Sequence, residues 1–332
     1  MDSKRPHKHC ALKKFYIIFC VLLMTSCTWV NDDTDDCPYG FWLNLHYTYN
    51  MLDVDAAPEY VKDVSIYVYD AEGNYVSRLD IPQSELWANN HHVRIVGLPE
   101  GDYQFVVWSG IGSSQYAVSG DKSTMDQFRL SLATSDIEVS DQLSDLYYGS
   151  LGTVHFDNSY ASHDVFMMKN TNQLACLVVP VSHHATVTPD DYDMSVVASN
   201  GVMGIRNLPA SDRAIVYKPF VKEAVSVDDA EYGQLQGISF NISTLRLMED
   251  KDCRLILEKK ETGETIFNIS FPEYIAMIGA LYTNLGRPLT VQEYLDRQDF
   301  HTIVFFLSED LHQLIRLQVN SWRLRAKNHL KL

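Results

Sequence analysis

The sequence predicts an all-β protein made of two tandem β-sandwich domains, with a short helical insertion in the second. Apolar and polar residues alternate over many short stretches, which is the periodicity of strands that bury one face. Turns that contain glycine or proline separate these stretches at intervals of about 8–12 residues, a spacing typical of sandwiches. The chain of 332 residues is long enough for two domains, which we expect at 37–160 and 161–332.

The first domain is expected to begin with a strand at 41–49, where apolar side chains occupy every second position. Gly73 lies in a short turn between two strand-like stretches, which predicts a hairpin with a residue at positive φ. Residues 82–87 are expected to form a short helix or a loop. Two further strands are predicted at 92–96 and 103–108, and a looser region follows at 109–161.

The second domain is also expected to consist mainly of strands. Gly263 suits the turn of a hairpin, and the apolar spacing changes to three and four residues after 273. Thr290, with Glu293 three residues later, has the pattern of a capped helix start, so a short helix is expected at 290–296. The strands are predicted at 165–169, 174–181, 214–219, 238–247, 254–258, 265–271, 301–307 and 313–325.

The N-terminal 26 residues have the layout of a secretory signal peptide: basic residues, then an apolar run, then small residues. The apolar run of about ten residues is too short for a bilayer span, which needs roughly 20. Met24-Thr25-Ser26-Cys27 resembles a bacterial lipobox. That resemblance implies cleavage before Cys27, a diacylglycerol on its thiol and acylation of the new amine, with palmitate as a typical fatty acid. The alternative is an ordinary signal peptide with a chance cysteine.

Residues 27–36 are polar and acidic, and we expect a flexible tether there because they cannot bury enough apolar surface to fold. The run lacks the spacing of a calcium-binding loop. Without residues 1–26, which hold five Lys/Arg and one acid, the chain keeps 22 basic and 42 acidic residues and a net charge of −20. Such a surface repels phosphate backbones, so no nucleic-acid partner is expected.

Three cysteines follow Cys27, and they have no close spacing. Cys176 and Cys253 lie in or beside apolar strand-like stretches, and we expect both to be buried thiols. A disulfide from Cys37 to one of them stays open, because an odd number of distant cysteines favours no framework.

The sequence holds no recognisable catalytic, cofactor-binding or metal-binding motif. The histidine pairs 91–92 and 183–184 are adjacent in sequence, and adjacent strand residues face opposite sides, so we expect surface histidines rather than metal ligands. A carboxylate pair for glycoside hydrolysis stays open, since acidic residues are abundant. The many aromatic residues would suit either a sugar-binding platform or, more commonly, the sandwich core.

Several motifs together resemble the fimbrillin-associated anchor proteins, which are minor fimbrial subunits and lipoproteins of Bacteroidetes. The resemblance extends over nearly the whole chain after Cys27. Ser321 departs from the pattern, since a glycine-like residue usually lies between Asn320 and Trp322. The motifs are the lipobox, the Asp-rich tether, Asp36-Cys37-Pro38 with Gly40, the hairpin at 64–73, and the segments at 101–108, 244–247, 294–300 and 319–322.

The resemblance implies two transthyretin-like sandwich domains and an anchor that holds a fimbria to the outer membrane through lipid on Cys27. Its partners would be fimbrial shaft or accessory subunits, joined by β-strand complementation. An anchor would keep its own first strand, here 41–49, and so end or limit assembly. The strand around 315–324 is a second candidate for contact with a subunit. Two alternatives are a tip or accessory subunit and a surface glycan-binding lipoprotein; a lipid-tethered hydrolase is least supported.

Overall fold

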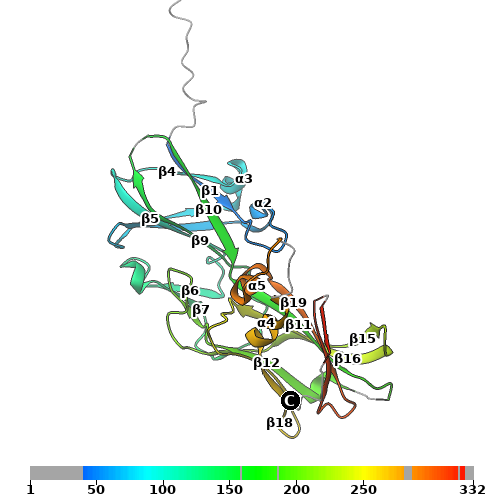
Figure 1. Cartoon of the computed structure of the whole chain (residues 1–332). Helices are drawn as coiled ribbons and strands as arrows, with labels where there is room; N and C mark the ends of the chain where they lie inside the picture. Colours follow the sequence, from blue (N-terminus) through cyan, green and yellow to red (C-terminus); the bar gives the residue numbers. More distant parts are fainter. Residues whose placement is uncertain (1–39, 158, 185–186, 280–285, 321, 326–332) are drawn as a thin grey trace, which may run out of the picture. The chain divides into compact units, whose positions relative to one another are not determined.

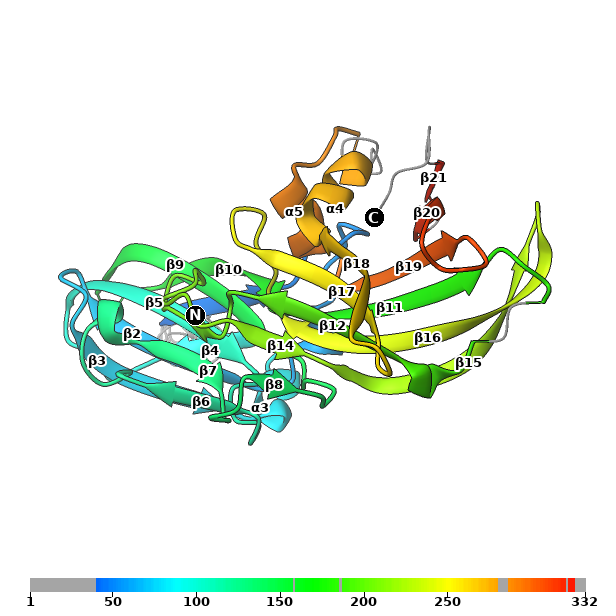
Figure 2. The same cartoon turned by 90° about the horizontal axis from the view of Figure 1, so that it is seen from below.

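The computed structural model describes residues 40–157, 159–184, 187–279, 286–320 and 322–325, and these residues form four β-sheets and a few short helices (Figures 1 and 2). We call the part from β1 to β10 the N-terminal half and the part from β11 to β21 the C-terminal half. Strands dominate both halves, so the all-β prediction is confirmed.

The N-terminal half is built on a seven-stranded sheet in the order β3-β2-β5-β9-β10-β1-β4. The sheet curls, and Phe41 of β1 stacks on Phe105 of β5 with ring centroids 5.4 Å apart. One group of strands therefore packs on the other around a shared core, which makes a sandwich. The strands are β1 (Phe41–His46), β2 (Val64–Asp70), β3 (Tyr75–Ile81), β4 (His92–Ile95), β5 (Gly101–Ser109), β9 (Tyr147–Phe156) and β10 (Ala161–Lys169).

A three-stranded sheet in the order β13-β7-β6 covers the opposite face of β2 and β5. Phe128 packs there edge-on against Tyr67 and parallel to Trp108, at centroid distances of 5.2 and 6.1 Å. Strand β2 thus buries both faces. The elements of this layer are β6 (Tyr116–Ser119), η3 (Met125–Gln127), β7 (Arg129–Leu132) and β13 (Val202–Met203).

The C-terminal half, together with β8 of the N-terminal half, forms a second sandwich of a six-stranded sheet (β15-β16-β11-β19-β20-β21) and a five-stranded sheet (β18-β17-β12-β14-β8). Phe267 of β18 stacks on Phe305 of β19 across the core at 4.5 Å. The strands are β8 (Glu138–Val139), β11 (Thr171–Pro180), β12 (Tyr192–Ala198), β14 (Ile215–Tyr217), β15 (Pro219–Asp229), β16 (Gly233–Leu245), β17 (Cys253–Lys259), β18 (Glu264–Ser270), β19 (Phe300–Leu307), β20 (Leu314–Val319) and β21 (Trp322–Arg325).

The predicted helical insertion is confirmed as two short helices, α4 (Phe271–Gly279) and α5 (Val291–Arg297). Thr290 is the N-cap of α5, and its Oγ1 accepts a hydrogen bond from the Glu293 N–H at 3.1 Å, as predicted. Asp296 of α5 forms a buried two-bond ion pair with Arg246. The remaining helices are α2 (Ala57–Tyr60), α3 (Gln83–Ala88) and η4 (Pro189–Asp191), and α3 fulfils the expectation for 82–87.

Other local predictions are confirmed by the backbone. Gly73 has φ +83° in the β2–β3 turn, and Gly263 has φ +68° between β17 and β18, conformations that glycine adopts without strain. The single strand predicted at 313–325 is wrong. Asn320 has φ +52° and begins a turn, so the segment folds back as the hairpin β20–β21.

The two halves are joined by more than the covalent chain. Strand β8 pairs with β14, and the Lys169 ammonium lies 3.0 Å from Asp145 and 2.8 Å from Asp299. The division at 160/161 remains a prediction, but β10 pairs with β9 and β1 and contributes Val165 and Met167 to the N-terminal core. We therefore propose that the boundary follows β10.

Candidate assembly interface

The first strand is one of the two predicted contact segments, and in the structure β1 lies between two other strands. It runs parallel to β10, with Phe41 opposite Ala161 and His46 opposite Phe166. It runs antiparallel to β4, with Phe41 opposite Ile95. Since both edges of β1 are hydrogen-bonded, its departure would leave two strands with unpaired backbone groups and a groove between them.

One face of β1 carries a row of buried apolar side chains, which we call the plugs. Phe41, Leu43 and Leu45 are buried, and the alternating residues 42, 44 and 46 are partly exposed. The Phe41 ring lies 5.4 Å from Phe105 and 5.4 Å from Phe156. Tyr47, just beyond the strand, is also buried and packs edge-on against Tyr147 at 5.2 Å. Buried side chains therefore occupy every second position from 41 to 47.

The C-terminal candidate at 315–324 is located at a sheet edge. Strand β21 is the last strand of the six-stranded sheet and pairs with β20 alone. The turn before it is held by Asn320, whose N–H donates to the Thr302 carbonyl at 2.7 Å and whose side-chain amide donates to the Tyr294 hydroxyl at 2.7 Å. The other edge of this sheet is β15, which is eleven residues long.

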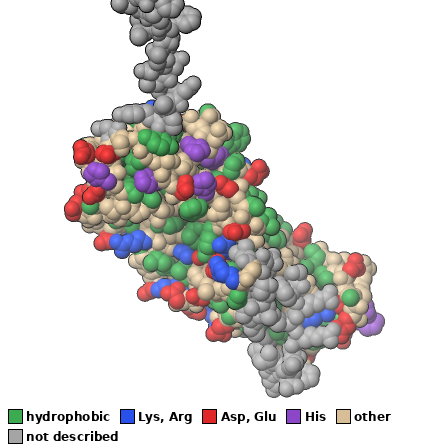
Figure 3. Space-filling model, turned by 45° about the horizontal axis from the view of Figure 1, so that its top comes forward, with side chains coloured by type: hydrophobic (Ala, Val, Ile, Leu, Met, Phe, Trp, Pro, Cys, Tyr) green, Lys and Arg blue, Asp and Glu red, His purple; other side chains and the backbone are tan. Residues whose placement is uncertain are grey.

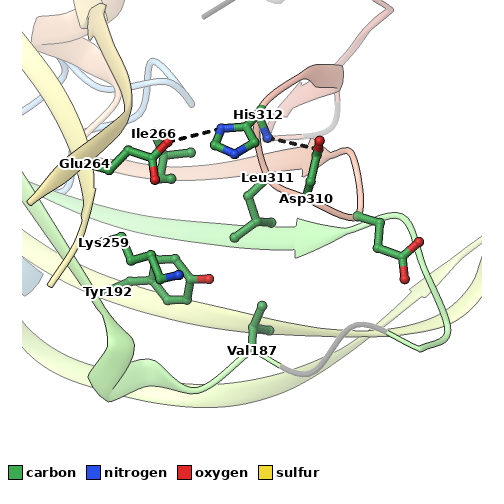
Figure 4. Close-up of a pocket in the computed structure, with 9 residues that line it drawn as sticks. Val187, Tyr192, Lys259, Glu264, Ile266, Asp310, Leu311 and His312 are labelled. Carbon is green, nitrogen blue, oxygen red and sulfur yellow. Dashed lines mark hydrogen bonds and ion pairs between the residues drawn. The ribbon is translucent and has the colours of Figure 1, made fainter. Parts of the chain in front are cut away.

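One pocket, of about 210 Å³, lies beside the turn that joins β19 to β20 (Figure 4). His312 Nδ1 lies 3.5 Å from Glu264 Oε1, and the His312 N–H donates to Asp310 Oδ1 at 3.3 Å. Tyr192, Lys259 and Leu311 complete much of the lining. The described lining contains no serine, threonine or cysteine. We interpret the His312–Glu264 pair as a contact between two sheets, since the half-exposed ion pair has no nucleophile to activate.

The predicted buried thiols are confirmed. Cys176 and Cys253 are free and buried, and burial raises the pKa of both, that of Cys253 to about 12. Neither is therefore a reactive thiolate at neutral pH. Cys37 lies outside the described residues, so its pairing stays open. Within the described ranges, no group of three His, Cys, Asp or Glu side chains is arranged to hold a metal ion.

The histidine prediction is only partly right. His183, His184 and His92 are exposed, but His91 is buried and its Nε2 lies 3.0 Å from the Val61 carbonyl oxygen. The reason is its backbone: His91 has φ +61°, so it lies in a turn rather than in the alternating strand that the sequence suggested. Sequence reasoning also missed His301, which is fully buried.

The predicted lipidation residue, Cys27, and the acidic tether lie outside the described residues. None of the helices in the described part of the chain is long and apolar enough to cross a membrane. The flanking strands β4 and β10 were not foreseen as partners of β1. Their own alternation was visible in the sequence, but nothing in it connects residue 41 with residue 161.

The fold defines the broad class, a sandwich protein of the all-β type. Comparison then identifies the family: the model of the fimbrillin-A associated anchor proteins Mfa1 and Mfa2 matches residues 34–328. The match covers most of the chain, so this protein belongs to that family, as the sequence motifs indicated. No curated protein matches the chain.

Solved structures agree with this assignment. A candidate polysaccharide-binding protein from Bacteroides thetaiotaomicron VPI-5482 is 28% identical, with a TM-score of 0.74 over 87% of this chain and 98% of that one. A candidate adhesin from the same organism is 26% identical, with a TM-score of 0.77 and the same coverage. The fimbrial anchor protein Mfa2 from Porphyromonas gingivalis is 18% identical, with a TM-score of 0.64 over 87% of this chain and all of that one, and shares the fold.

Membership of this family assigns the chain a fimbrial anchoring or accessory role. It is a structural protein that acts with fimbrial subunits, and it is not an enzyme.

Proposed function

We propose that this protein is an outer-membrane lipoprotein that anchors a fimbria to the cell surface and limits its assembly by β-strand complementation. Lipid on Cys27 would provide the membrane attachment, and residues 28–36 would separate the folded part from the bilayer. Strand β1 would occupy the groove that another subunit's strand fills elsewhere in the fibre.

The observation that supports the proposal is the position of β1 within its sheet. It is paired along both edges, and Phe41, Leu43 and Leu45 are inserted into the N-terminal core. A groove filled by its own chain has no vacancy for a donor strand, and β-augmentation requires a free strand edge. Residues 28–40 contain no Lys or Arg, so they offer no basic cleavage point through which β1 would be removed.

The attachment is tested with Cys27→Ala, with Cys37→Ala as the matched control. We expect Cys27→Ala cells to release fimbriae into the medium, while Cys37→Ala cells keep them. Fimbriae that stay attached to Cys27→Ala cells at normal length would contradict the anchor, and would favour a tip or accessory position.

The limit on assembly is tested separately, with Leu43→Asp. A carboxylate at this buried position should displace β1 and open the groove, because an unpaired charge is costly to bury. We expect longer fimbriae that include this chain between other subunits; Thr48→Val, at the end of the same segment, should leave fimbrial length unchanged. An unaltered length distribution in Leu43→Asp cells would remove strand complementation from the proposal.

A second candidate, glycan binding, is favoured by the 28% identical candidate polysaccharide-binding protein and by several exposed aromatic side chains. Trp87 is 56% exposed, and Tyr60 and Tyr160 are about half exposed. Retention on a polysaccharide column that is lost in Trp87→Ala would support this candidate. If the protein is not retained on the column, glycan binding is excluded and anchoring is the only function still proposed.

A further inference from the structure

The outer face of β1 is paired with particular side chains of the two neighbouring strands. Trp42, Asn44 and His46 alternate with the buried plugs, and each lies directly opposite residues of β4, β10 or both. Figure 3 shows histidines interspersed with carboxylates on the upper part of the molecule, where β1, β4 and β10 lie in Figure 1.

Asn44 is the centre of this outer row, because it faces His92 on β4 and Asp164 on β10 at once. Its Oδ1 lies 2.6 Å from His92 Nδ1. Its Nδ2 donates to Asp164 Oδ1 at 2.8 Å and to Ser162 Oγ at 2.9 Å. The bond from Asn44 lowers the pKa of Asp164, so the acceptor is ionised at neutral pH. A single carboxamide therefore bridges three strands.

The residues on either side extend the row. His46 Nδ1 lies 2.7 Å from Asp55 Oδ2, and its Nε2 lies 3.4 Å from Asp164 Oδ1. Asp55 in turn accepts bonds from the backbone N–H groups of Tyr47 and Ala57, at 2.9 and 3.0 Å, which ties the end of β1 to the start of α2.

At the other end, the Arg94 guanidinium lies 6.0 Å from the Trp42 ring centroid. A Cβ at Gly40 would come within 2.8 Å of Arg94 Nε, and φ at Gly40 is +115°. Glycine at position 40 therefore leaves room for Arg94 beside the first residues of the strand.

The two faces of β1 carry different information. Any strand with apolar side chains at every second position can satisfy the inner pockets, and a slip of two residues would keep that alternation intact. The same slip would move Asn44 away from His92 and Asp164 and bring Trp42 or His46 into its place. The outer row thus distinguishes the native register, and the native strand, from one that merely alternates.

We propose that the outer row of β1, centred on Asn44, is the specificity element that keeps this strand in its groove in preference to the donor strand of another subunit. The inference rests on the proposed strand complementation and adds the residues that select the occupant. The segment that fits this groove is an extended strand with alternating apolar residues and a side-chain amide between the second and third plugs.

The test uses the purified full-length chain carrying Leu43→Ala, in which β1 is weakened but no charge is buried. Three fluorescein-labelled peptides of residues 41–49 are added: the native sequence, Asn44→Val and the control Thr48→Val. Bound peptide is measured by fluorescence anisotropy and after gel filtration. We expect the native and Thr48→Val peptides to bind equally, and the Asn44→Val peptide about tenfold more weakly, since it loses three side-chain bonds.

Equal binding of the Asn44→Val and native peptides would overturn the inference, as would failure of every peptide to enter the Leu43→Ala chain. Hydrogen exchange of full-length Asn44→Val is a second measurement. Faster exchange is expected in β1 but not in β2, and an equal increase in both strands would show a general loss of stability instead. Release of fimbriae by Cys27→Ala together with equal peptide binding would leave the anchor intact and remove only the selection.

Discussion

Strands β1 and β11 are the first strands of the two halves. They have similar topological positions but differ in length and in how deeply they are buried. Each lies between one parallel and one antiparallel neighbour: β10 and β4 for β1, and β19 and β16 for β11. Strand β1 has only six residues, and its antiparallel neighbour β4 is an edge strand of four residues. Strand β11 has ten residues, between partners of eight and thirteen.

The two strands differ in how many of their faces are buried in apolar cores. Leu174, Cys176 and Val178 of β11 lie in the main core, and Val179 lies in a small apolar cluster on the other face. The inner face of β1 meets a single core, and its outer face meets polar side chains. The two strands share a pairing pattern, but β11 is longer and buries both faces. We therefore expect β1 to be displaced more easily than β11, the scaffold strand of the C-terminal half.

The largest effect should come from placing a carboxylate in each strand. Cys176→Asp would bury an unpaired charge in the scaffold strand, at a cost comparable with a whole domain's stability of roughly 5–15 kcal/mol. We expect no folded C-terminal half in that variant. Leu43→Asp should free β1 while β11 stays protected. Hydrogen exchange distinguishes the two, with Cys176→Ala as the size control; equal loss of protection in both halves would contradict the comparison.

The next largest effect should come from breaking the buried ion pair that joins α5 to Arg246. Asp296 accepts bonds from Arg246 at 2.7 and 2.8 Å, and both residues are buried. Asp296→Ala leaves a buried guanidinium unpaired and should cost about 3–5 kcal/mol in urea unfolding. The double variant Arg246→Met/Asp296→Leu should recover most of that loss.

The neighbouring Arg297 points to the other half, where it donates to the Asn50 carbonyl at 2.9 Å. Arg297→Ala should cost only about 1 kcal/mol. A larger loss of unfolding free energy from Arg297→Ala than from Asp296→Ala would mean that α5 stabilises the N-terminal half more than the C-terminal half.

Acid sensitivity should be concentrated beside β11. Burial lowers the pKa of His301 in β19 to about 4. Unfolding releases a histidine that binds a proton near pH 6.5, so stability is full above that pH and is lost as pH falls toward 4. We expect a loss of roughly 3 kcal/mol over this window.

The measurement is urea unfolding at a series of pH values between 7 and 4. His301→Leu should flatten the profile over this window, whereas the exposed control His184→Gln should not. An unchanged slope in His301→Leu would mean that other groups cause the acid sensitivity.

The smallest effect concerns the helix cap. The Thr290 side chain caps α5, whereas α2 and α3 of the N-terminal half have no side-chain cap. Thr290→Ala should cost about 1 kcal/mol by thermal unfolding, and Thr290→Ser should cost much less. Comparable losses in the two variants would indicate that the threonine methyl group, rather than the cap, stabilises this turn.

Local features of this fold were predictable because their causes are local. The Gly73 and Gly263 turns need only a residue that tolerates positive φ, and the Thr290 cap needs an oxygen within three residues. The C-terminal strand failed as a prediction because alternation continues on both sides of Asn320, and the turn there is stabilised by Thr302 and Tyr294, which are distant in the sequence. His91 failed for a related reason, since its partner is the Val61 carbonyl.

The sequence by itself determined the all-β class, the helical insertion, the burial of Cys176 and Cys253, and the family, since each depends on residue type and spacing along the chain. Tertiary structure alone decided that β1 lies between β4 and β10, and that Asn44 faces His92 and Asp164. The physical reason is that alternation specifies which face of a strand is buried but not which strand will pair with it. That choice comes from backbone hydrogen bonds and side-chain contacts between residues 48 and 120 positions apart.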